Sequence, residues 1–224
     1  MEIKVLKDIL SANDQIAQEN RQLLDSNGVL TINVMSSPGA GKTSLILETI
    51  RRLKGDVKIG VIEGDVSSSI DAETIGKEGV PVIQINTGGE CHLDASMTYR
   101  ALSNLPLQDI ELLFIENVGN LICTAEFTIG ADKNMVISST PEGDDKPLKY
   151  PLMFTVADIV LVNKIDLLPH VQFDTGAYNK TVKNLNENVE IFEVSCTTGQ
   201  GIDQWLSWLQ NHLRAHKETV EKEV

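Results

Sequence analysis

The sequence predicts an α/β protein whose mostly parallel sheet is flanked by helices on both faces, with a further helix at the N-terminus. Apolar runs of strand length alternate with segments of helical periodicity. Several runs are too apolar to have one face in water, which favours parallel strands covered on both sides. Hydrophobic residues make up 42% of the 224 residues, enough for one domain with a large core.

Three parts are expected along the chain. Residues 1–28 form an N-terminal amphipathic helical segment, residues 29–215 form the main domain, and residues 216–224 form a charged tail that frays. In the first part, apolar residues recur at helical spacing over 3–27 (Ile3, Leu6, Ile9, Leu10, Ile16, Leu23 and Leu24), and no Gly or Pro precedes Gly28. The expected strands are 30–35, 58–62, 80–85, 112–116, 135–138, 159–163 and 190–194, and the expected helices of the domain include 43–53 and 202–213.

The charge and cysteine content exclude some functions. The net charge of −13 repels nucleic acid and anionic lipid, so neither is an expected partner, although solubility alone also explains such a charge. No apolar run is long enough to span a bilayer, and the N-terminus does not look like a signal peptide. Three cysteines without the spacing of a disulfide framework favour a reducing compartment, so we expect a cytoplasmic protein.

A phosphate-binding loop follows the first expected strand. Residues 36–43 read Ser-Ser-Pro-Gly-Ala-Gly-Lys-Thr, between a strand and a helix. Glycines in this loop let backbone N–H groups face a β-phosphate, and the helix N-terminus adds its dipole. Lys42 would bridge the β- and γ-phosphates and Thr43 would offer its hydroxyl to Mg²⁺. The residues expected to bind the phosphates are Ser37, Pro38, Gly39, Ala40, Gly41, Lys42, Thr43 and Ser44.

A second segment is expected to sense the γ-phosphate. The strand 112–116 ends in Glu116, and Gly119 follows shortly after. This arrangement is typical of P-loop GTPases, in which the carboxylate holds a water linked to Mg²⁺ and the glycine N–H responds to the phosphate. Asp65, which ends the second expected strand, is expected to associate with Mg²⁺ or orient water, and Asp71 competes for that role. Lys42, Asp65, Glu116 and Gly119 are thus the expected catalytic residues, and Thr43, Asp65 and Glu116 the expected Mg²⁺ ligands.

The base is expected to be guanine. Residues 163–166 read Asn-Lys-Ile-Asp after an apolar strand, and Asp166 can accept hydrogen bonds from the N1–H and the exocyclic amine of guanine. Adenine has a lone pair in place of N1–H, which would leave the carboxylate unpaired at a cost of about 1–3 kcal/mol. Lys164 would lie over the base and ribose, and the loop at Ser195 and Cys196 would complete recognition. Residues 29–215 are therefore expected to form a P-loop GTPase domain.

A metal site is also indicated. Cys91 and His92 are adjacent in a glycine-rich turn, and Cys123 lies seven residues after Glu116. Thiolates and imidazoles are ligands for Ni²⁺ and Zn²⁺. Three ligands do not close a tetrahedral cage, but a twofold dimer brings four thiolates and two imidazoles together. A single cytosolic Cys is otherwise a small core residue.

These segments resemble the hydrogenase maturation nickel-insertion GTPases, the HypB family. The resemblance covers nearly all of residues 30–210 and rests on six segments: 36–43, 61–65, 88–95, 116–121 with Cys123, 142–151 and 163–169. It implies a P-loop protein of the SIMIBI class, which acts as a nucleotide-gated homodimer. The loops show no obvious arginine finger, so we expect slow intrinsic GTP hydrolysis.

The resemblance also implies roles for particular residues. Cys91, His92 and Cys123 match the family's metal site at the dimer interface, where nickel, or zinc at the same site, is held. Lys149 matches a lysine that reaches the partner's nucleotide, and Leu167 and Val171 match apolar dimer contacts. The implied partners are a hydrogenase maturation protein and the hydrogenase large-subunit precursor, and the implied function is nickel delivery to [NiFe]-hydrogenase.

Three alternatives remain. A urease-type nickel-insertion GTPase belongs to the same class, but its Cys-Pro-His motif does not occur in this sequence. A P-loop kinase for a small metabolite would have a lid rich in Arg and would not need residues 163–166. A metal-binding or scaffold protein without nucleotide would not need the phosphate loop.

Overall fold

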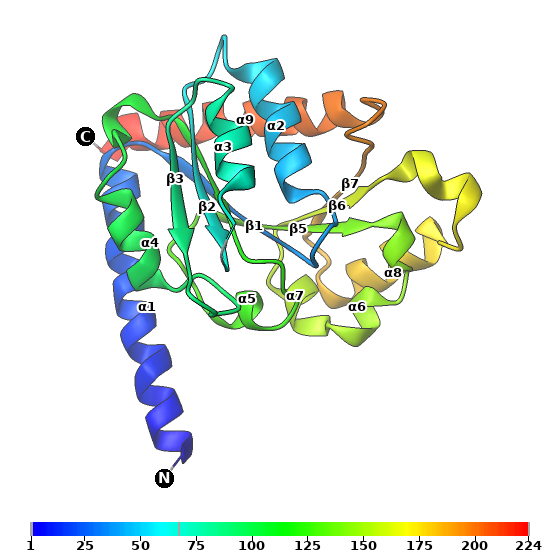
Figure 1. The fold of residues 1–224 in the computed structure, drawn as a ribbon, viewed down its shortest axis with the longest axis horizontal. Coiled ribbons are helices and arrows are strands. Elements are labelled where there is room, and N and C mark those ends of the chain that lie inside the picture. The colour runs from blue at the N-terminus through cyan, green and yellow to red at the C-terminus, as the bar shows by residue number, and fades with distance from the viewer. Residues whose placement is uncertain (1, 67, 224) are drawn as a thin grey trace.

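The strands form one parallel sheet. The computed structural model describes the backbone of residues 2–66 and 68–223, and the side chains of residues 10–66 and 68–220. Within these ranges seven strands pair in the order β3-β2-β4-β1-β5-β6-β7, all parallel (Figure 1). The fold class predicted from the sequence is confirmed. The strands are β1 (Leu30–Ser36), β2 (Ile59–Asp65), β3 (Val82–Asn86), β4 (Leu112–Glu116), β5 (Lys133–Ser139), β6 (Ile159–Asn163) and β7 (Glu190–Glu193).

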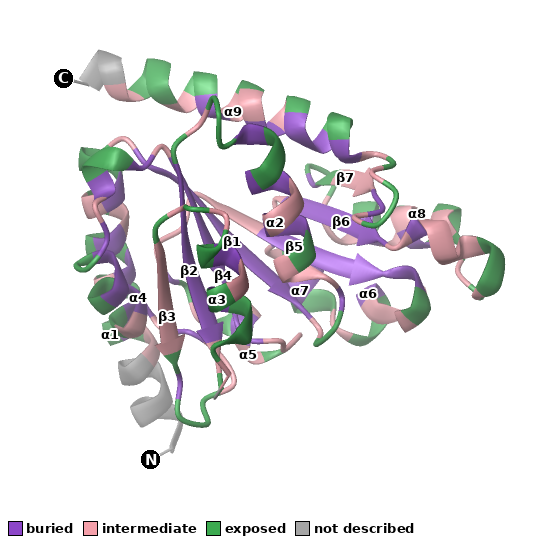
Figure 2. Cartoon of the chain, turned by 45° about the horizontal axis from the view of Figure 1, so that its top comes forward, coloured by how far each residue is buried: buried purple, intermediate pink, exposed green. Residues whose placement is uncertain are grey.

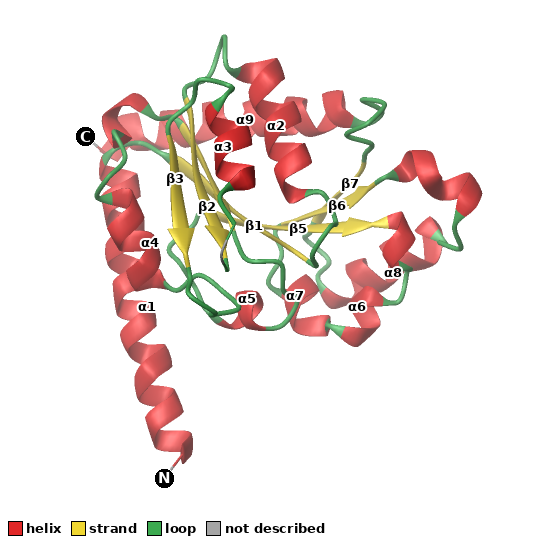
Figure 3. Ribbon diagram, viewed as in Figure 1, coloured by secondary structure: helices red, strands yellow, loops and turns green. Residues whose placement is uncertain are grey.

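Helices cover both faces of the sheet (Figure 3). Side chains of α2, α3 and α9 share one buried cluster with the sheet, while those of α1 and α4, and those of α7 and α8, form two clusters on the opposite face. The sequence analysis had not located the helices between α2 and α9. The helices are α1 (Glu2–Ser26), α2 (Lys42–Leu53), α3 (Ile70–Gly76), α4 (Ala95–Leu102), α5 (Cys123–Glu126), α6 (Lys146–Lys149), α7 (Pro151–Thr155), α8 (Thr175–Leu185) and α9 (Ile202–Glu223).

The central strands are apolar on both faces because both faces are covered (Figure 2). In β4, Leu112 and Phe114 pack in the cluster of α2 and α9, whereas Leu113 and Ile115 pack in the cluster of α1 and α4. Successive side chains of a strand point to opposite faces. The same alternation places Glu116, at the end of β4, on the α2 side.

Helix α1 confirms the helix predicted over residues 3–27. Leu24 is fully buried in the cluster that α1 shares with α4. Two polar side chains on α1 also bind the rest of the chain: Asn13 Nδ2 donates to Thr128 O at 2.8 Å, and Asn20 Nδ2 donates to Ala95 O at 2.8 Å. The side chains of the expected apolar positions Ile3, Leu6 and Ile9, and residue 1, lie outside the described residues.

The expected end of the closing helix at residue 213 is wrong, because α9 continues to Glu223. Residues 214–223 contain no Gly or Pro, so nothing in this stretch interrupts a helix. Lys217 also pairs with Glu111 at 2.6 Å, which fixes this part of α9 to the loop before β4. The division into an N-terminal segment, a domain and a fraying tail over 216–224 stays a prediction; residue 224 lies outside the described residues.

The fold brings the predicted site residues to one edge of the sheet. Strands β1, β2, β4 and β6 are parallel, so the loops that follow them meet at their carboxyl ends. Ligands of open α/β sheets bind outside these ends. Among the helices that the structure describes, none is long and apolar enough to cross a membrane.

Candidate nucleotide and metal site

The phosphate loop has the backbone conformation that its glycines predict. Gly39 and Gly41 have φ angles of +76° and +106°, in the left-handed region that favours glycine. A Cβ atom on Gly41 would collide with the side-chain amide of Asn163. Lys42 and Thr43 begin α2, which has no side-chain cap at its N-terminus. The N–H groups of its first turn are thus available to an anion.

Glu116 lies against the start of α2. Its Oε1 accepts a hydrogen bond from Thr43 Oγ1 at 2.8 Å and lies 3.9 Å from Lys42 Nζ. The side chain is buried, and its Oε2 has no hydrogen-bond partner among the described residues. Burial raises the pKa of Glu116 to about 7, against the lowering effect of Lys42 and Thr43. A hydroxyl beside an unpaired carboxylate oxygen is an oxygen donor set that fits Mg²⁺.

Gly119 lies directly against the phosphate loop. A Cβ atom at this position would be 3.0 Å from Cα of Pro38, closer than ordinary van der Waals contact. A side chain at this position would therefore force the two segments apart by a few tenths of an ångström. The structure places Gly119 next to the loop that is expected to hold the phosphates, as its predicted role requires.

A second buried carboxylate, Glu63, was not among the residues predicted from the sequence. Glu63 in β2 is the direct neighbour of Glu116 in β4, so both side chains point to the same face of the sheet. It is 2% exposed, and its Oε2 has no hydrogen-bond partner among the described residues. Burial, together with the charge of Glu116, raises the pKa of Glu63 to about 8. Only the strand pairing reveals this juxtaposition, since the two residues are far apart in the sequence.

The two candidate aspartates lie before and after the loop that joins β2 to α3. Asp65 is the last residue of β2 and accepts a hydrogen bond from Ser68 N at 2.7 Å. Asp71 is exposed, in the first turn of α3. Each contributes to raising the pKa of Glu63 and of Glu116, so both lie within electrostatic reach of the carboxylate pair. The preference for Asp65 stays a prediction.

The predicted base-reading residues are held together by hydrogen bonds. Asp166 Oδ1 accepts from Ser195 Oγ at 2.5 Å, which orients the carboxylate. Asn163 connects two loops: its Nδ2 donates to Ala40 O at 3.0 Å, and its Oδ1 accepts from Cys196 N at 3.3 Å. The base loop and the phosphate loop are thus fixed relative to each other.

Lys164 also contacts the phosphate loop. It has a left-handed φ of +62°, and its Nζ donates to Gly39 O at 2.6 Å. A left-handed conformation at a residue with a side chain is uncommon and persists where the surroundings enforce it. Cys196, the cysteine of the base loop, is partly buried, and burial raises the pKa of its thiol to about 11.

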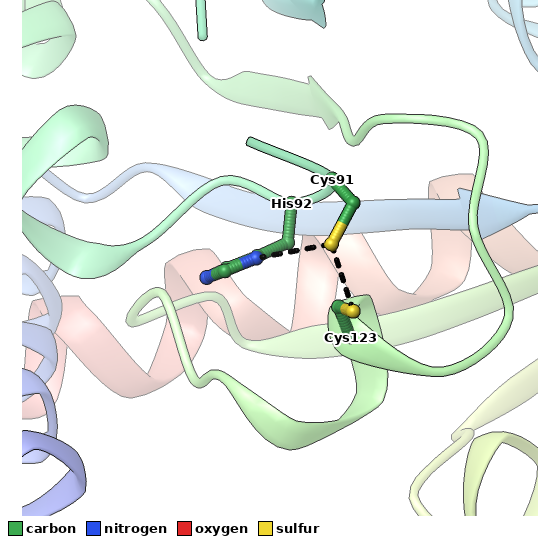
Figure 4. A group of neighbouring side chains, drawn as sticks. All are labelled: Cys91, His92 and Cys123. Carbon is green, nitrogen blue, oxygen red and sulfur yellow. Dashed lines mark hydrogen bonds between the residues drawn. The ribbon is translucent and has the colours of Figure 1, made fainter. Parts of the chain in front are cut away.

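The three predicted metal ligands converge (Figure 4). Cys91 Sγ lies 2.8 Å from Cys123 Sγ and 3.8 Å from His92 Nδ1, and the three donor atoms all lie within 4.8 Å of one another. The contact with Cys91 raises the pKa of the Cys123 thiol. The His92 ring stacks on Phe127 at 4.0 Å, which orients the imidazole. Two thiols and an imidazole form a soft donor set suited to Ni²⁺ or Zn²⁺.

The predicted dimer residues lie on the outside of the chain. Lys149 is exposed, and its Nζ pairs with Asp145 at 2.5 Å, which raises the pKa of the lysine. Leu167 lies within the helical turn Ile165–His170 and Val171 directly follows it, and both side chains are half-buried. Their contacts with a second chain stay predictions.

One further contact at the phosphate loop was missed from the sequence. Ser37 Oγ donates to Glu142 Oε1, and the other oxygen of Glu142 accepts from Ser139 N at 3.0 Å. Glu142 therefore joins the phosphate loop to the loop that leads to Lys149. Glu142 belongs to one of the segments that carry the family resemblance, which is the signal that singles it out.

These features define a P-loop nucleotide-binding protein with a thiol and imidazole cluster beside the nucleotide site. Residues 30–193 match a family model described as the CobW/HypB/UreG nucleotide-binding domain. The hydrogenase maturation factor HypB of Escherichia coli strain K12 is 47% identical over 208 residues, which cover 93% of this chain and 72% of the relative. The chain therefore belongs to the HypB family of hydrogenase maturation factors.

Solved structures agree with this assignment. HypB from Helicobacter pylori, crystallised in complex with nickel, is 38% identical and has a TM-score of 0.87, covering 91% of this chain and 96% of that one. The signal recognition particle receptor FtsY from Elizabethkingia anophelis is 16% identical with a TM-score of 0.54, covering 81% of this chain and 65% of that one. The second likeness shows the fold alone.

Proposed function

We propose that this protein binds and hydrolyses GTP, and that the nucleotide controls the holding and release of nickel during [NiFe]-hydrogenase maturation. One observation carries the proposal: the segment from Glu116 to Cys123 reaches from the phosphate loop to the metal cluster. Relatives named as hydrogenase maturation factors favour hydrogenase over the urease alternative. Membership of this family gives no support to a metabolite kinase.

The nucleotide side of the proposal rests on Asp166. Its carboxylate is oriented by Ser195, so it can accept hydrogen bonds from both N1–H and the exocyclic amine of guanine. Asn163 keeps this carboxylate at a fixed place relative to the phosphate loop. GTP is therefore the substrate whose base fits Asp166 and whose phosphates fit the phosphate loop.

Hydrolysis rests on the residues at the start of α2 and the end of β4. Thr43, Glu116 and Asp65 would hold Mg²⁺, which supplies positive charge beside the phosphates. Lys42 supplies a further positive charge, and Gly119 is close enough to the phosphate loop for its N–H to respond to the γ-phosphate. The loops at 36–44 and 116–122 contain no Arg, so we expect slow intrinsic turnover.

Nickel is the cargo of the proposed reaction. Cys91, His92 and Cys123 offer three donors, and the same triad of a second chain would complete the site at a GTP-dependent dimer interface. Lys149 would then leave Asp145 and reach the partner's nucleotide, and Leu167 and Val171 would pack between the chains. Zn²⁺ fits the same donors. Both thiols must be reduced, which agrees with the expected cytoplasmic location. The receiving proteins would be a maturation partner and the hydrogenase large-subunit precursor.

Nucleotide preference tests the enzymatic part. Phosphate release is measured with GTP, ATP and XTP for the unmodified protein and for Asp166→Asn. The unmodified protein should prefer GTP, and the variant should lose about 5- to 150-fold in kcat/KM with GTP, because one lost buried hydrogen bond is worth about 1–3 kcal/mol. XTP, which carries an oxygen in place of the exocyclic amine, should become the better substrate of the variant. Preferential use of ATP by the unmodified protein would overturn the assignment.

A further inference from the structure

Asn117 is a buried amide at the junction of the two sites. It is the residue after β4, between Glu116 and the loop that contains Gly119, and it is fully buried. Its Oδ1 accepts two hydrogen bonds, from Leu93 N at 2.9 Å and from Val118 N at 3.0 Å. One oxygen atom thus joins the backbone after His92 to the backbone of the segment that faces the phosphate loop.

The orientation of this amide is fixed. Asn117 Nδ2 donates to Asn33 Oδ1 at 3.2 Å, Asn33 Nδ2 donates to Asn134 Oδ1 at 3.0 Å, and Asn134 Nδ2 donates to Val156 O at 3.3 Å. Reversing the Asn117 amide would place an N–H₂ group against two N–H donors. Asn117 Oδ1 therefore stays turned toward Leu93, in the loop that carries Cys91 and His92.

The loop that carries Cys91 and His92 is tightly packed at Leu93, where Asn117 binds it. Leu93 is fully buried, and its side chain fills the space over Gly64, where an added Cβ would lie 2.7 Å from the leucine. A shift of its backbone is therefore passed to the neighbouring residue His92 rather than absorbed by loose packing. On the other side, Asn117 is the direct neighbour of Glu116, which binds Thr43.

We propose that Asn117 is a positioning residue that transmits the nucleotide state from Glu116 and Gly119 to the metal ligands through its hydrogen bond to Leu93. The inference rests on the proposed function, since it names the side chain through which GTP changes metal affinity. One side chain spans this route, whereas the route along the chain from Glu116 to Cys123 is seven residues long. Through this route Cys91 and His92, and not only Cys123, would shift when the nucleotide changes.

The test compares metal affinity in two nucleotide states. Ni²⁺ affinity is measured by competition with a coloured chelator, once with GDP and once with a non-hydrolysable GTP analogue, and the ratio of the two affinities is the readout. Coupling of the usual strength gives the unmodified protein a ratio of about 5 to 150. Asn117→Ala should bring the ratio below about 2, and thermal unfolding checks that the variant is folded. A merely structural role would lower the melting temperature and leave the ratio unchanged.

Three further variants make the result specific. Asn117→Asp keeps the acceptor for Leu93, and its carboxyl group, kept protonated by burial, can still donate to Asn33 Oδ1, so this variant should retain most of the ratio. Asn117→Ser should lose it like Asn117→Ala, because the hydroxyl is too short to span both N–H groups, and it replaces the alanine variant if that one does not fold. Tyr178→Phe removes a different buried hydrogen bond, from the phenol to Ser138, and should keep the ratio.

The outcomes separate the two proposals. An unmodified protein with a ratio of one contradicts nucleotide control of the metal, and with it the role of Asn117. A ratio well above one that persists in Asn117→Ala and Asn117→Ser contradicts the role of Asn117 alone.

Discussion

The buried pair of Glu63 and Glu116 predicts an unusual dependence of stability on pH. The two carboxylates are neighbours on paired strands, and burial raises the pKa of Glu63 to about 8. In the unfolded chain the same group titrates near its ordinary value of 4.5. As pH rises from 4.5 to about 8, the unfolded chain releases this proton and the folded protein retains it. Stability contributed by neutral Glu63 is therefore lost over this window.

The magnitude follows from the size of the pKa change. At about 1.4 kcal/mol per pKa unit, the change from 4.5 to about 8 corresponds to about 5 kcal/mol, on the order of the stability of a small domain. Glu63→Gln keeps the shape of the protonated carboxyl and cannot ionise. We expect the variant to be more stable than the unmodified protein by about 3–5 kcal/mol at pH 8.5, and to differ by less than about 1 kcal/mol at pH 4.5.

Denaturation in urea at a series of pH values measures this effect. Trp205 is fully buried and stacks on Trp208 at 5.6 Å, so tryptophan fluorescence reports unfolding. Glu78→Gln is the matched control, because hydrogen bonds from Lys54 and Arg51 lower the pKa of Glu78 and its loss should destabilise rather than stabilise at pH 8.5. The reasoning is refuted if Glu63→Gln gives no gain at pH 8.5, or an equal gain at pH 4.5.

Two substitutions test the phosphate loop and the metal cluster. Gly41→Ala should abolish measurable nucleotide binding in calorimetry and lower the melting temperature, because a Cβ collides with Asn163; Gly39→Ala, whose Cβ meets nothing within 4 Å, should have the smaller effect on stability. Equal melting temperatures for the two variants would contradict the collision. Cys123→Ser should reduce Ni²⁺ affinity at least about tenfold by removing one of three ligands. Cys196→Ser, in the base loop, should leave Ni²⁺ affinity unchanged, and a similar loss in both variants would argue against the assigned cluster.

The centre of the sheet could be predicted from the sequence because its central strands are buried on both faces. The limits of β4 and β6 agree with the apolar runs at 112–116 and 159–163. The end of α9 could not be found in the same way. The prediction stopped at Leu213, whereas the helix continues through mostly polar, helix-forming residues to Glu223.

The site was predicted where the chemistry is contiguous in sequence and missed where it depends on pairing. The phosphate loop, the base-reading residues and Cys91 with His92 are short motifs. Glu63 lies within an apolar strand, and only the register of β2 and β4 places it beside Glu116. Asn117 contacts Leu93, 24 positions earlier, through a backbone N–H that any residue except proline provides. Neither the spacing of the two residues nor their types predicts such a contact.

The central claim is that the nucleotide state controls nickel binding. The most direct measurement compares Ni²⁺ affinity and dimerisation of the unmodified protein with GDP and with a non-hydrolysable GTP analogue, by chelator competition and light scattering. The account predicts that dimerisation depends on the GTP analogue and that Ni²⁺ affinity differs between the two states by about 5-fold or more. Equal nickel affinity and equal dimerisation in the two states would contradict it.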